Sequence, residues 1–148
     1  MLKFKIYNPN TKMNTLEKLN ATEFLYKHLE QYGDKKTDIE KAIDFALQNF
    51  TSFGGFVLEG YNKENEIVGT VVVNKTGMTG YIPENILVYI AVDKTYRGKG
   101  YGKQLMNKAI ELSEGDVALH VEKDNPARFL YEKVGFTNPY LEMRLKKA

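Results

Sequence analysis

The sequence predicts an α/β (α+β) fold in which helices lie on both faces of one sheet. Three observations favour this fold. Strand-like and helix-like segments follow one another in the order strand, two helices, three strands, helix, strand, helix and closing strands. Residues 86–92 are apolar on both alternating faces, which is typical of a central strand covered on both sides. A glycine-rich turn, residues 97–102, connects that strand to the next helix.

The first expected elements are a strand and a helix. Residues 2–7 alternate apolar residues with lysines, a pattern that predicts a half-exposed strand. Asn14 followed by Glu17 has the spacing of a helix cap. We therefore expect a helix from there to about Tyr32, where Gly33 would end it.

A second helix and a pair of strands are expected next. Thr37 and Glu40 have the spacing of a capping box, and the apolar residues that follow recur at helical intervals, so an amphipathic helix is predicted. Residues 56–58 and 67–73 resemble strands, joined by the polar turn 62–65.

The second half of the chain alternates strands and helices. After the loop 74–85, strand 86–92 should lead into a helix over about 100–113, which Gly115 would end. Residues 117–122 form the next expected strand.

The C-terminal part predicts a short helix and closing strands. Asn125 and Pro126 are typical of a helix N-cap and first turn, and this helix should end before Gly135. Phe136 and the alternating apolar residues of 141–145 predict the closing strands.

Length and composition predict one soluble domain over residues 1–148. With a net charge of +2 and dispersed basic residues, nothing favours nucleic-acid binding. The absence of cysteine excludes disulfides, thiolate nucleophiles and Cys-based zinc sites, and no metal is expected. There is neither a signal-peptide pattern nor an apolar run near the ~20 residues of a membrane helix. We expect a cytoplasmic monomer or homodimer that binds no membrane.

The glycine turn is the segment that indicates chemistry. A strand, a glycine-rich turn and a helix start bring free backbone N–H groups and the positive end of a helix dipole to one point, which is typical of an anion site. The turn does not match Walker A, because Lys103 is followed by Gln104 rather than Ser or Thr. It does not match the dinucleotide fingerprint either, because Lys103 stands where the third glycine is required.

Two blocks of the sequence resemble the GNAT superfamily of acetyl-CoA-dependent N-acetyltransferases. The first is Arg-x-x-Gly-x-Gly after an apolar strand, at residues 97–102. The second is residues 119–136, Leu-His-Val-Glu-Lys-Asp-Asn-Pro-Ala-Arg-Phe-Leu-Tyr-Glu-Lys-Val-Gly-Phe. The resemblance implies a mixed, mostly antiparallel sheet with splayed central strands and helices on both faces.

The resemblance also implies how acetyl-CoA binds. Pantetheine would pair with the backbone of Ile90, Ala91 and Val92, and backbone N–H groups of the turn would hold the pyrophosphate. The implied cofactor-binding residues of the turn and its surroundings are Arg97, Gly98, Lys99, Gly100, Tyr101, Gly102, Lys103, Asn125 and Arg128. Three of these residues also fit an ordinary structural role: Lys103 and Arg128 could be plain surface residues, and Asn125 has the position of a helix cap.

Catalytic residues follow from the same resemblance. Tyr131 would protonate the departing CoA thiolate, although it also shares an apolar helix stripe and could be a packed aromatic residue. Relatives often place a glutamate base on the central strand, where this chain has the apolar Ile86. Glu84 and Glu122, and also His120, are substitutes for that base, and a water-relayed base or an amine that arrives deprotonated remains open.

The predicted function is direct transfer of an acetyl group from acetyl-CoA to a primary amine. A small amine, an antibiotic-like amine and a peptide or protein amine are all possible acceptors. Since Ile86 replaces the usual carboxylate, the alternative is a non-catalytic module that binds CoA and acts as a sensor or assembly partner.

Overall fold

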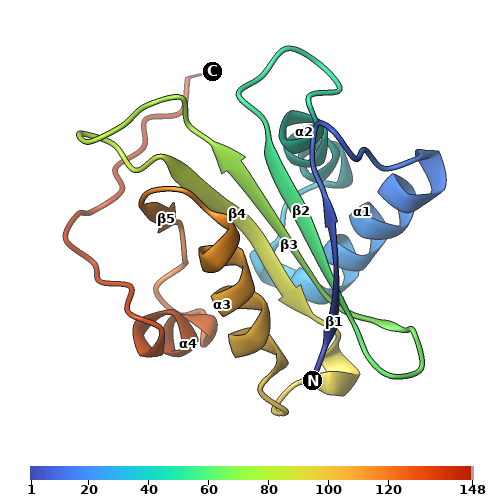
Figure 1. Cartoon of the computed structure of the whole chain (residues 1–148). Helices are drawn as coiled ribbons and strands as arrows, with labels where there is room; N and C mark the ends of the chain where they lie inside the picture. The colour runs from blue at the N-terminus through green and yellow to red at the C-terminus, as the bar shows by residue number, and fades with distance from the viewer. Residues whose placement is uncertain (148) are drawn as a thin grey trace.

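A computed structural model describes residues 1–147. Its centre is a five-stranded sheet in the order β1-β2-β3-β4-β5. The strands are β1 (Lys3–Tyr7), β2 (Gly55–Tyr61), β3 (Ile67–Lys75), β4 (Asn85–Val92) and β5 (Val117–Leu119). The first four pair antiparallel and β5 pairs parallel to β4. The predicted mixed, mostly antiparallel sheet is therefore confirmed (Figure 1).

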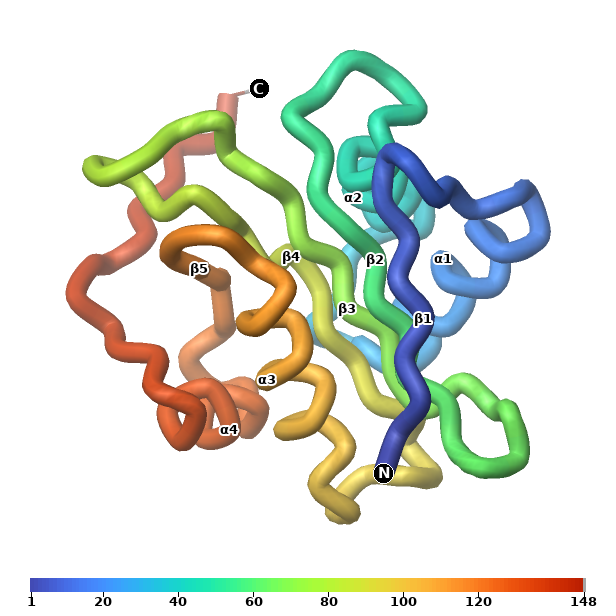
Figure 2. The backbone as a smooth tube through the Cα atoms, in the orientation of Figure 1, coloured from blue at the N-terminus to red at the C-terminus, as the bar shows by residue number. Residues whose placement is uncertain are grey.

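Helices cover both faces of this sheet, as predicted. The helices α1 (Thr15–Leu29) and α2 (Lys36–Leu47) lie on one face, and α3 (Tyr101–Leu112) and α4 (Ala127–Lys133) on the other (Figures 1 and 2). Each face has its own apolar core, because strand side chains alternate between the two sides. Ala91 and Tyr89 belong to the α1/α2 core, whereas Leu87 belongs to the α3/α4 core.

Two strand glycines let α3 lie close to the sheet. A Cβ on Gly69 would stand 2.2 Å from Leu105 Cδ1, and one on Gly60 would stand 3.1 Å from Leu105 Cδ2. Leu105 itself is fully buried. Its side chain therefore packs directly on these two backbone positions and sets the distance between α3 and the sheet. The glycine turn lies at the N-terminus of this helix.

One predicted helix cap is confirmed and one is wrong. Asn14 Oδ1 accepts the Glu17 N–H at 2.8 Å, and Glu17 Oε1 accepts the Asn14 N–H at 2.9 Å, which completes a capping box. At the second helix, α2 already begins at Lys36 and no side chain caps it. Thr37 therefore lies inside the first turn, where its hydroxyl cannot act as the cap.

The C-terminal half departs from the prediction in two places. The strand expected over 117–122 is limited to Val117–Leu119. The closing strands at Phe136 and 141–145 are wrong, because the described residues after α4 contain no strand. Within residues 1–147, the backbone after Phe136 makes no hydrogen bond, and Leu141, Met143 and Leu145 are each at least 85% exposed. Alternation makes a strand only where a neighbouring edge supplies partners, and Pro139 removes one donor.

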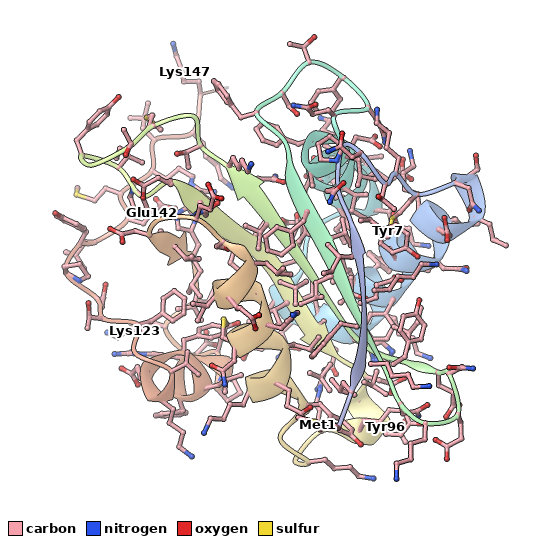
Figure 3. All side chains as sticks on the ribbon, viewed as in Figure 1. Met1, Tyr7, Tyr96, Lys123, Glu142 and Lys147 are labelled. Atoms are coloured by element: carbon pink, nitrogen blue, oxygen red, sulfur yellow. The ribbon has the colours of Figure 1, made fainter. Side chains whose placement is uncertain are left out.

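Glu142 and Lys147 mark this outer segment in Figure 3. Over residues 1–147, the helices fall short of the length and apolar character that crossing a bilayer requires.

Candidate active site

The site forms where β4 and β5 separate. The two strands pair only over Asn85–Leu87 and Val117–Leu119, after which β5 ends and β4 continues to Val92. From Val88 on, the edge of β4 that faces away from β3 has no strand partner within residues 1–147. Its backbone groups have no strand partner, although Val92 O accepts from Arg97 Nε at 3.3 Å, so the edge before that carbonyl is available to an extended ligand.

A β-bulge lies at the point of separation. Val72 is opposite Tyr89 and Val73 is opposite Leu87, so Val88 is an extra residue in β4. A bulge bends its strand and increases the local twist. The bulge therefore accounts for the divergence of β4 from β5 directly after their last shared pair.

The side chains of Ile90, Ala91 and Val92 pack into the two cores. Ala91 is buried against α1 and α2, and Ile90 and Val92 are half-buried against α3 and α4. Any contribution of these residues to a ligand therefore comes from their backbone.

The glycine turn has the geometry of an anion site. Gly98 and Gly100 have φ values of 82° and 81°, a left-handed conformation that glycine adopts without steric cost. A Cβ on either residue would meet no atom within 4 Å, so the outer side of the turn is open. Within the described chain, the backbone N–H groups of residues 98–103 donate to no protein acceptor. These free donors at the start of the 12-residue helix α3 fit a phosphate group.

The basic side chains around the turn have different surroundings. Arg97 points away from the turn and binds the end of α1, where its Nη2 donates to His28 O at 2.6 Å. Lys99 lies over the Tyr96 ring, with Nζ 5.6 Å from the centroid. Lys103 is exposed and makes no hydrogen bond or ion pair within residues 1–147. Of the three cations, Lys103 is the one whose ammonium has no competing protein partner.

Tyr101 and Gly102 begin α3 and belong to the packing around the turn. Tyr101 is half-buried, with its ring 6.4 Å from that of Tyr96 in an edge-on arrangement. A Cβ on Gly102 would stand 3.1 Å from Leu130 Cδ2 and 3.7 Å from Val92 Cγ2. Glycine at this position therefore allows close contact of α3 with α4 and with the end of β4.

Asn125 and Arg128 lie at the start of α4. The helix α4 begins at Ala127 with Pro126 at its N-cap position, so the predicted N-cap at Asn125 is one residue too early; Asn125 Oδ1 nevertheless accepts the Ala127 N–H at 2.9 Å. Its side-chain NH₂ donates to no group of residues 1–147, so it is free for a ligand. Arg128 Nε lies 3.5 Å from Glu132 Oε2 in an exposed ion pair one turn along the helix. The structure therefore gives Arg128 an ordinary surface contact.

Tyr131 is buried in the α3/α4 core, with 8% of its surface exposed. Its ring meets that of Phe136 edge-on, with centroids 6.2 Å apart. Burial raises the pKa of its hydroxyl to about 12. The hydroxyl oxygen has no hydrogen-bond partner within residues 1–147, yet it is not among the fully enclosed polar atoms. Tyr131 is therefore a packed aromatic residue whose hydroxyl is not completely enclosed.

Glu84 is held by hydrogen bonds that make it a weak base. Its carboxylate accepts from Thr79 Oγ1 at 2.6 Å, the Asp116 N–H at 2.8 Å and the Gly80 N–H at 3.3 Å. The Thr79 hydrogen bond, followed by the backbone donors, lowers the pKa of Glu84 to about 2. Glu84 thus connects the β3–β4 loop to the turn before β5.

His120 and Glu122 follow the last residue of β5. Both are exposed, and His120 comes directly after Leu119, which is opposite Leu87 in the last β4–β5 pair. His120 therefore stands at the point where the two strands separate. Ile86 is half-buried and pairs with Ala118.

Sequence reasoning missed two contacts made by the segment between α1 and α2. Tyr89 Oη donates to Asp34 Oδ2 at 2.5 Å, and Tyr32 Oη donates to Asp124 O at 3.4 Å. The first contact fixes the segment on β4, and the second connects it to the loop before α4. Neither pair has a local sequence signal, because 55 and 92 residues separate the partners.

Comparisons with known proteins agree with this geometry. The profile of the "Acetyltransferase (GNAT) family" matches residues 14–136. The [ribosomal protein bS18]-alanine N-acetyltransferase of Haemophilus influenzae is 40% identical over 78 residues, which are 50% of this chain and 50% of that protein. The chain thus matches about half the length of this curated relative.

Solved structures give the same fold. A GNAT-family acetyltransferase from Streptococcus pneumoniae superimposes with a TM-score of 0.68 at 17% identity, over 99% of this chain and 98% of that one. A ribosomal-protein-alanine N-acetyltransferase from Brucella melitensis has a TM-score of 0.65 at 17% identity, over 99% of this chain and 100% of that one.

Proposed function

The chain belongs to the acetyltransferase (GNAT) family, and on that premise we propose that it transfers an acetyl group from acetyl-CoA directly to a protein N-terminal amine. The family predicted from the two sequence blocks is confirmed. The observation that carries the proposal is the position of the turn. Its free N–H groups, at residues 98–103, lie at the end of the same strand whose edge is unpaired from Val88 on.

The donor half of the reaction uses backbone groups. The N–H groups of the turn would hold the pyrophosphate, with Lys103 as the nearby free cation. The unpaired edge of β4 at Ile90–Val92 would pair with the amides of pantetheine, as an added strand does. Acetyl-CoA supplies the activated acetyl group. An N–H of the same edge would polarise the carbonyl oxygen that the amine attacks.

Tyr131 would act as the acid. The raised pKa keeps its hydroxyl protonated over the neutral range, so it can donate to the sulfur that leaves as the new amide bond forms. The amine proton must go to a base, because an ammonium group is no nucleophile.

The base is assigned to the segment after β5. Glu84 is left out of this role, since its three donors make it too weak to accept a proton from an ammonium group. His120 is proposed instead, because imidazole accepts protons near neutral pH and the residue stands where β4 and β5 separate. Glu122, two residues further on and also exposed, is the second candidate.

The acceptor is proposed from the Haemophilus influenzae relative, whose name specifies the alanine of a ribosomal protein. A peptide N-terminus is a cationic, extended ligand. The carboxylates of Asp34, Glu122 and Asp124 lie on segments that flank the separated strands or contact one of them, which suits such a charge.

The experiment is an acetyl-transfer assay with purified protein. Release of the CoA thiol is followed with a thiol-reactive dye, and since the chain has no cysteine, the protein adds no background signal. Acceptors are short peptides that begin with alanine, the same peptides with a blocked N-terminus, and a panel of small amines. Acetylation at the free N-terminus, identified by mass spectrometry, is the expected result.

Two other outcomes would change the proposed acceptor or the proposed function. Turnover of small amines but not of peptides would overturn the proposed acceptor and leave the transferase in place. CoA binding without thiol release for any amine would instead favour the non-catalytic CoA sensor. Gly100→Val should abolish CoA binding in every case, because a β-branched residue cannot adopt the φ of 81° without strain.

A further inference from the structure

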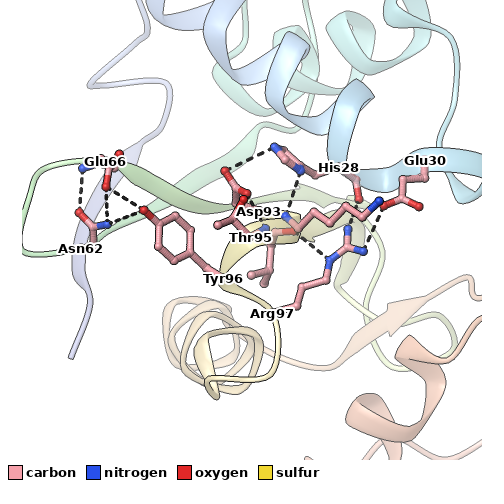
Figure 4. Close-up of polar contacts among 10 residues, drawn as sticks. His28, Glu30, Asn62, Glu66, Asp93, Thr95, Tyr96 and Arg97 are labelled. Carbon is pink, nitrogen blue, oxygen red and sulfur yellow. Dashed lines mark hydrogen bonds and ion pairs between the residues drawn. The ribbon is translucent and has the colours of Figure 1, made fainter.

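The guanidinium of Arg97, the first residue of the glycine turn, donates one hydrogen bond from each of its three nitrogens to other parts of the protein, and the side chain is 44% exposed. Nη2 donates to His28 O at 2.6 Å, Nη1 to Glu30 Oε1 at 3.2 Å, and Nε to Val92 O at 3.3 Å (Figure 4). His28 and Glu30 lie at the C-terminal end of α1, where helix carbonyls lack partners and a cation is favourable. Arg97 thus caps α1 rather than facing the side of the turn where the N–H groups are free.

His28 makes a second connection between the same two segments. His28 is 8% exposed, and its Nδ1 accepts the Lys94 N–H at 3.2 Å. Nε2 must then carry the proton, and it faces Asp93 Oδ2 at 3.6 Å. Acceptance by Nδ1 requires a neutral ring, and burial lowers the pKa of His28, against the opposing effect of Asp93, which favours that form. Lys94 and Arg97, on either side of the short segment before the glycines, are therefore both attached to α1.

A third connection holds the opposite side of that segment. Tyr96 Oη donates to Glu66 Oε1 at 2.8 Å and lies 3.3 Å from Asn62 Nδ2, both in the β2–β3 turn. Figure 4 shows these contacts on one side of residues 94–97 and the contacts of His28 and Glu30 on the other. Tyr96 lies next to Met1 at the same end of the molecule (Figure 3). The residues before Gly98 are thus fixed from two sides.

The end of α1 also begins the segment that carries Asp34, which is proposed to face the acceptor. Glu30 has φ 55° and ψ −129°, a strained conformation for a residue with a side chain, and Arg97 binds its carboxylate. The chain then continues through Tyr32 and Asp34, which contact Asp124 and Tyr89. The cofactor turn and the acceptor-facing segment are therefore attached to the same helix end.

We propose that Arg97 and His28 are positioning residues that hold the pyrophosphate turn against the end of α1, so that its N–H groups converge before acetyl-CoA binds. This inference rests on the proposed function, because it takes CoA as the ligand of the turn. Arg97 acts through α1 and not by touching the pyrophosphate. His28, which carries no charge, has the same role.

The test is calorimetric titration of CoA into the wild-type protein and into Arg97→Lys, His28→Phe and the double variant. Arg97→Lys keeps the charge but cannot reach three acceptors, and His28→Phe removes the acceptor for Lys94. Each single change should weaken CoA binding roughly two- to thirtyfold, as expected for residues that act through a shared element. Because both residues act on one element, their losses in CoA affinity should not multiply. The CoA affinity of the double variant should be close to that of either single variant.

Two controls separate positioning from direct phosphate contact and from unfolding. Acetyl-pantetheine has no pyrophosphate, so its affinity should be unchanged in these variants, whereas a general loss of structure would lower it as well. Lys103→Ala removes the free cation. When it is combined with His28→Phe, the two losses in CoA affinity should multiply. His28→Asn places an acceptor oxygen near the position of Nδ1, so its CoA affinity should be close to that of the wild type. This variant can be measured even if His28→Phe does not fold.

The outcomes are distinct. Unchanged CoA affinity in His28→Phe together with a loss in Arg97→Lys would mean that Arg97 contacts the phosphate directly, and the inference would be overturned. Losses that multiply in the double variant would overturn it too. If the wild-type protein itself binds no CoA, the proposed function fails first.

Discussion

Replacing Tyr131 with phenylalanine removes one oxygen from a ring that keeps its packing. The ring is 8% exposed and contacts Phe136 edge-on, and neither property depends on the hydroxyl. The fold and the affinity for CoA should therefore be preserved. A general acid contributes about 10²- to 10⁴-fold to a rate. Since the pKa of Tyr131 is about 12, its proton is released less readily than that of an ordinary tyrosine, so we expect a loss near the lower limit.

That expectation is a fall in kcat of about a hundredfold, or about 2.7 kcal/mol of activation free energy. The assay is thiol release at saturating acetyl-CoA, measured from pH 7 to pH 10. Because the pKa of about 12 keeps Tyr131 protonated across this range, the ratio of wild-type to variant kcat should stay constant. Tyr140→Phe, the same change at a residue that is 85% exposed, is the matched control and should have wild-type turnover.

Stability gives a second readout that does not depend on catalysis. The pKa of Tyr131 is higher in the folded protein, about 12, than in the unfolded chain, about 10. Its contribution to the free energy of unfolding is thus fully present below pH 10 and is lost as the pH rises through 12. The two-unit difference corresponds to about 3 kcal/mol. The wild-type protein should lose up to that amount relative to Tyr131→Phe between pH 9 and pH 12 in denaturant titrations.

Two results would refute these roles of Tyr131. Unchanged kcat in Tyr131→Phe, with CoA binding intact, would exclude Tyr131 as the acid. A ratio of wild-type to Tyr131→Phe kcat that declines as the pH approaches 10 would mean that the hydroxyl titrates as an exposed tyrosine does, which would contradict its burial in the structure.

Three further predictions concern other parts of the chain. Leu105→Ala should lower the free energy of unfolding by about 2–5 kcal/mol, since it empties a fully buried contact between α3 and the sheet; a loss below about 1 kcal/mol in urea titrations would contradict this packing. Glu84→Gln should leave kcat unchanged, because the carboxylate is committed to structural donors, and a large fall in thiol release would return Glu84 to the catalytic residues. Glu59 is 2% exposed, and burial raises its pKa against the opposing hydrogen bond from Tyr61. With the folded pKa above the unfolded value, the contribution of Glu59 to stability is greatest at acidic pH and declines as the pH rises through the folded pKa. Glu59→Gln should therefore be more stable than wild type at pH 7 and lose that advantage near pH 4 in thermal unfolding. A stability difference that does not change with pH would refute the role of this charge.

Local sequence signals predicted the elements that depend on local interactions. The capping box of Asn14 and Glu17 closes within one helical turn, so its spacing is sufficient to predict it. The glycine turn was predictable for a similar reason: Gly98 and Gly100 supply φ values that other residues avoid, wherever the rest of the chain lies. The conformation of the glycine turn, on which the proposed donor site depends, could therefore be predicted from the sequence.

The features that were wrong or missed depend on distant partners. Leu141, Met143 and Leu145 alternate as in a strand, but no sheet edge pairs with them in the described structure. Glu84 is acidic in sequence and a weak base in the structure, because donors from Thr79 and Asp116 hold its charge. A residue type shows which chemistry is possible, whereas its partners decide whether that chemistry is available.

Arg97 illustrates the same distinction within the motif itself. In sequence it is a cation beside a phosphate turn, and electrostatics favours direct contact with the anion. In the structure all of its donating nitrogens have acceptors in α1, on Glu30 and at the end of β4. Turning it toward a phosphate would leave the carbonyl of His28 without its partner and the strained Glu30 without its ion pair. Those losses oppose the gain from one exposed charge pair, which is commonly worth only about 0–1 kcal/mol. The balance favours an arginine that shapes the turn and leaves the anion to the backbone.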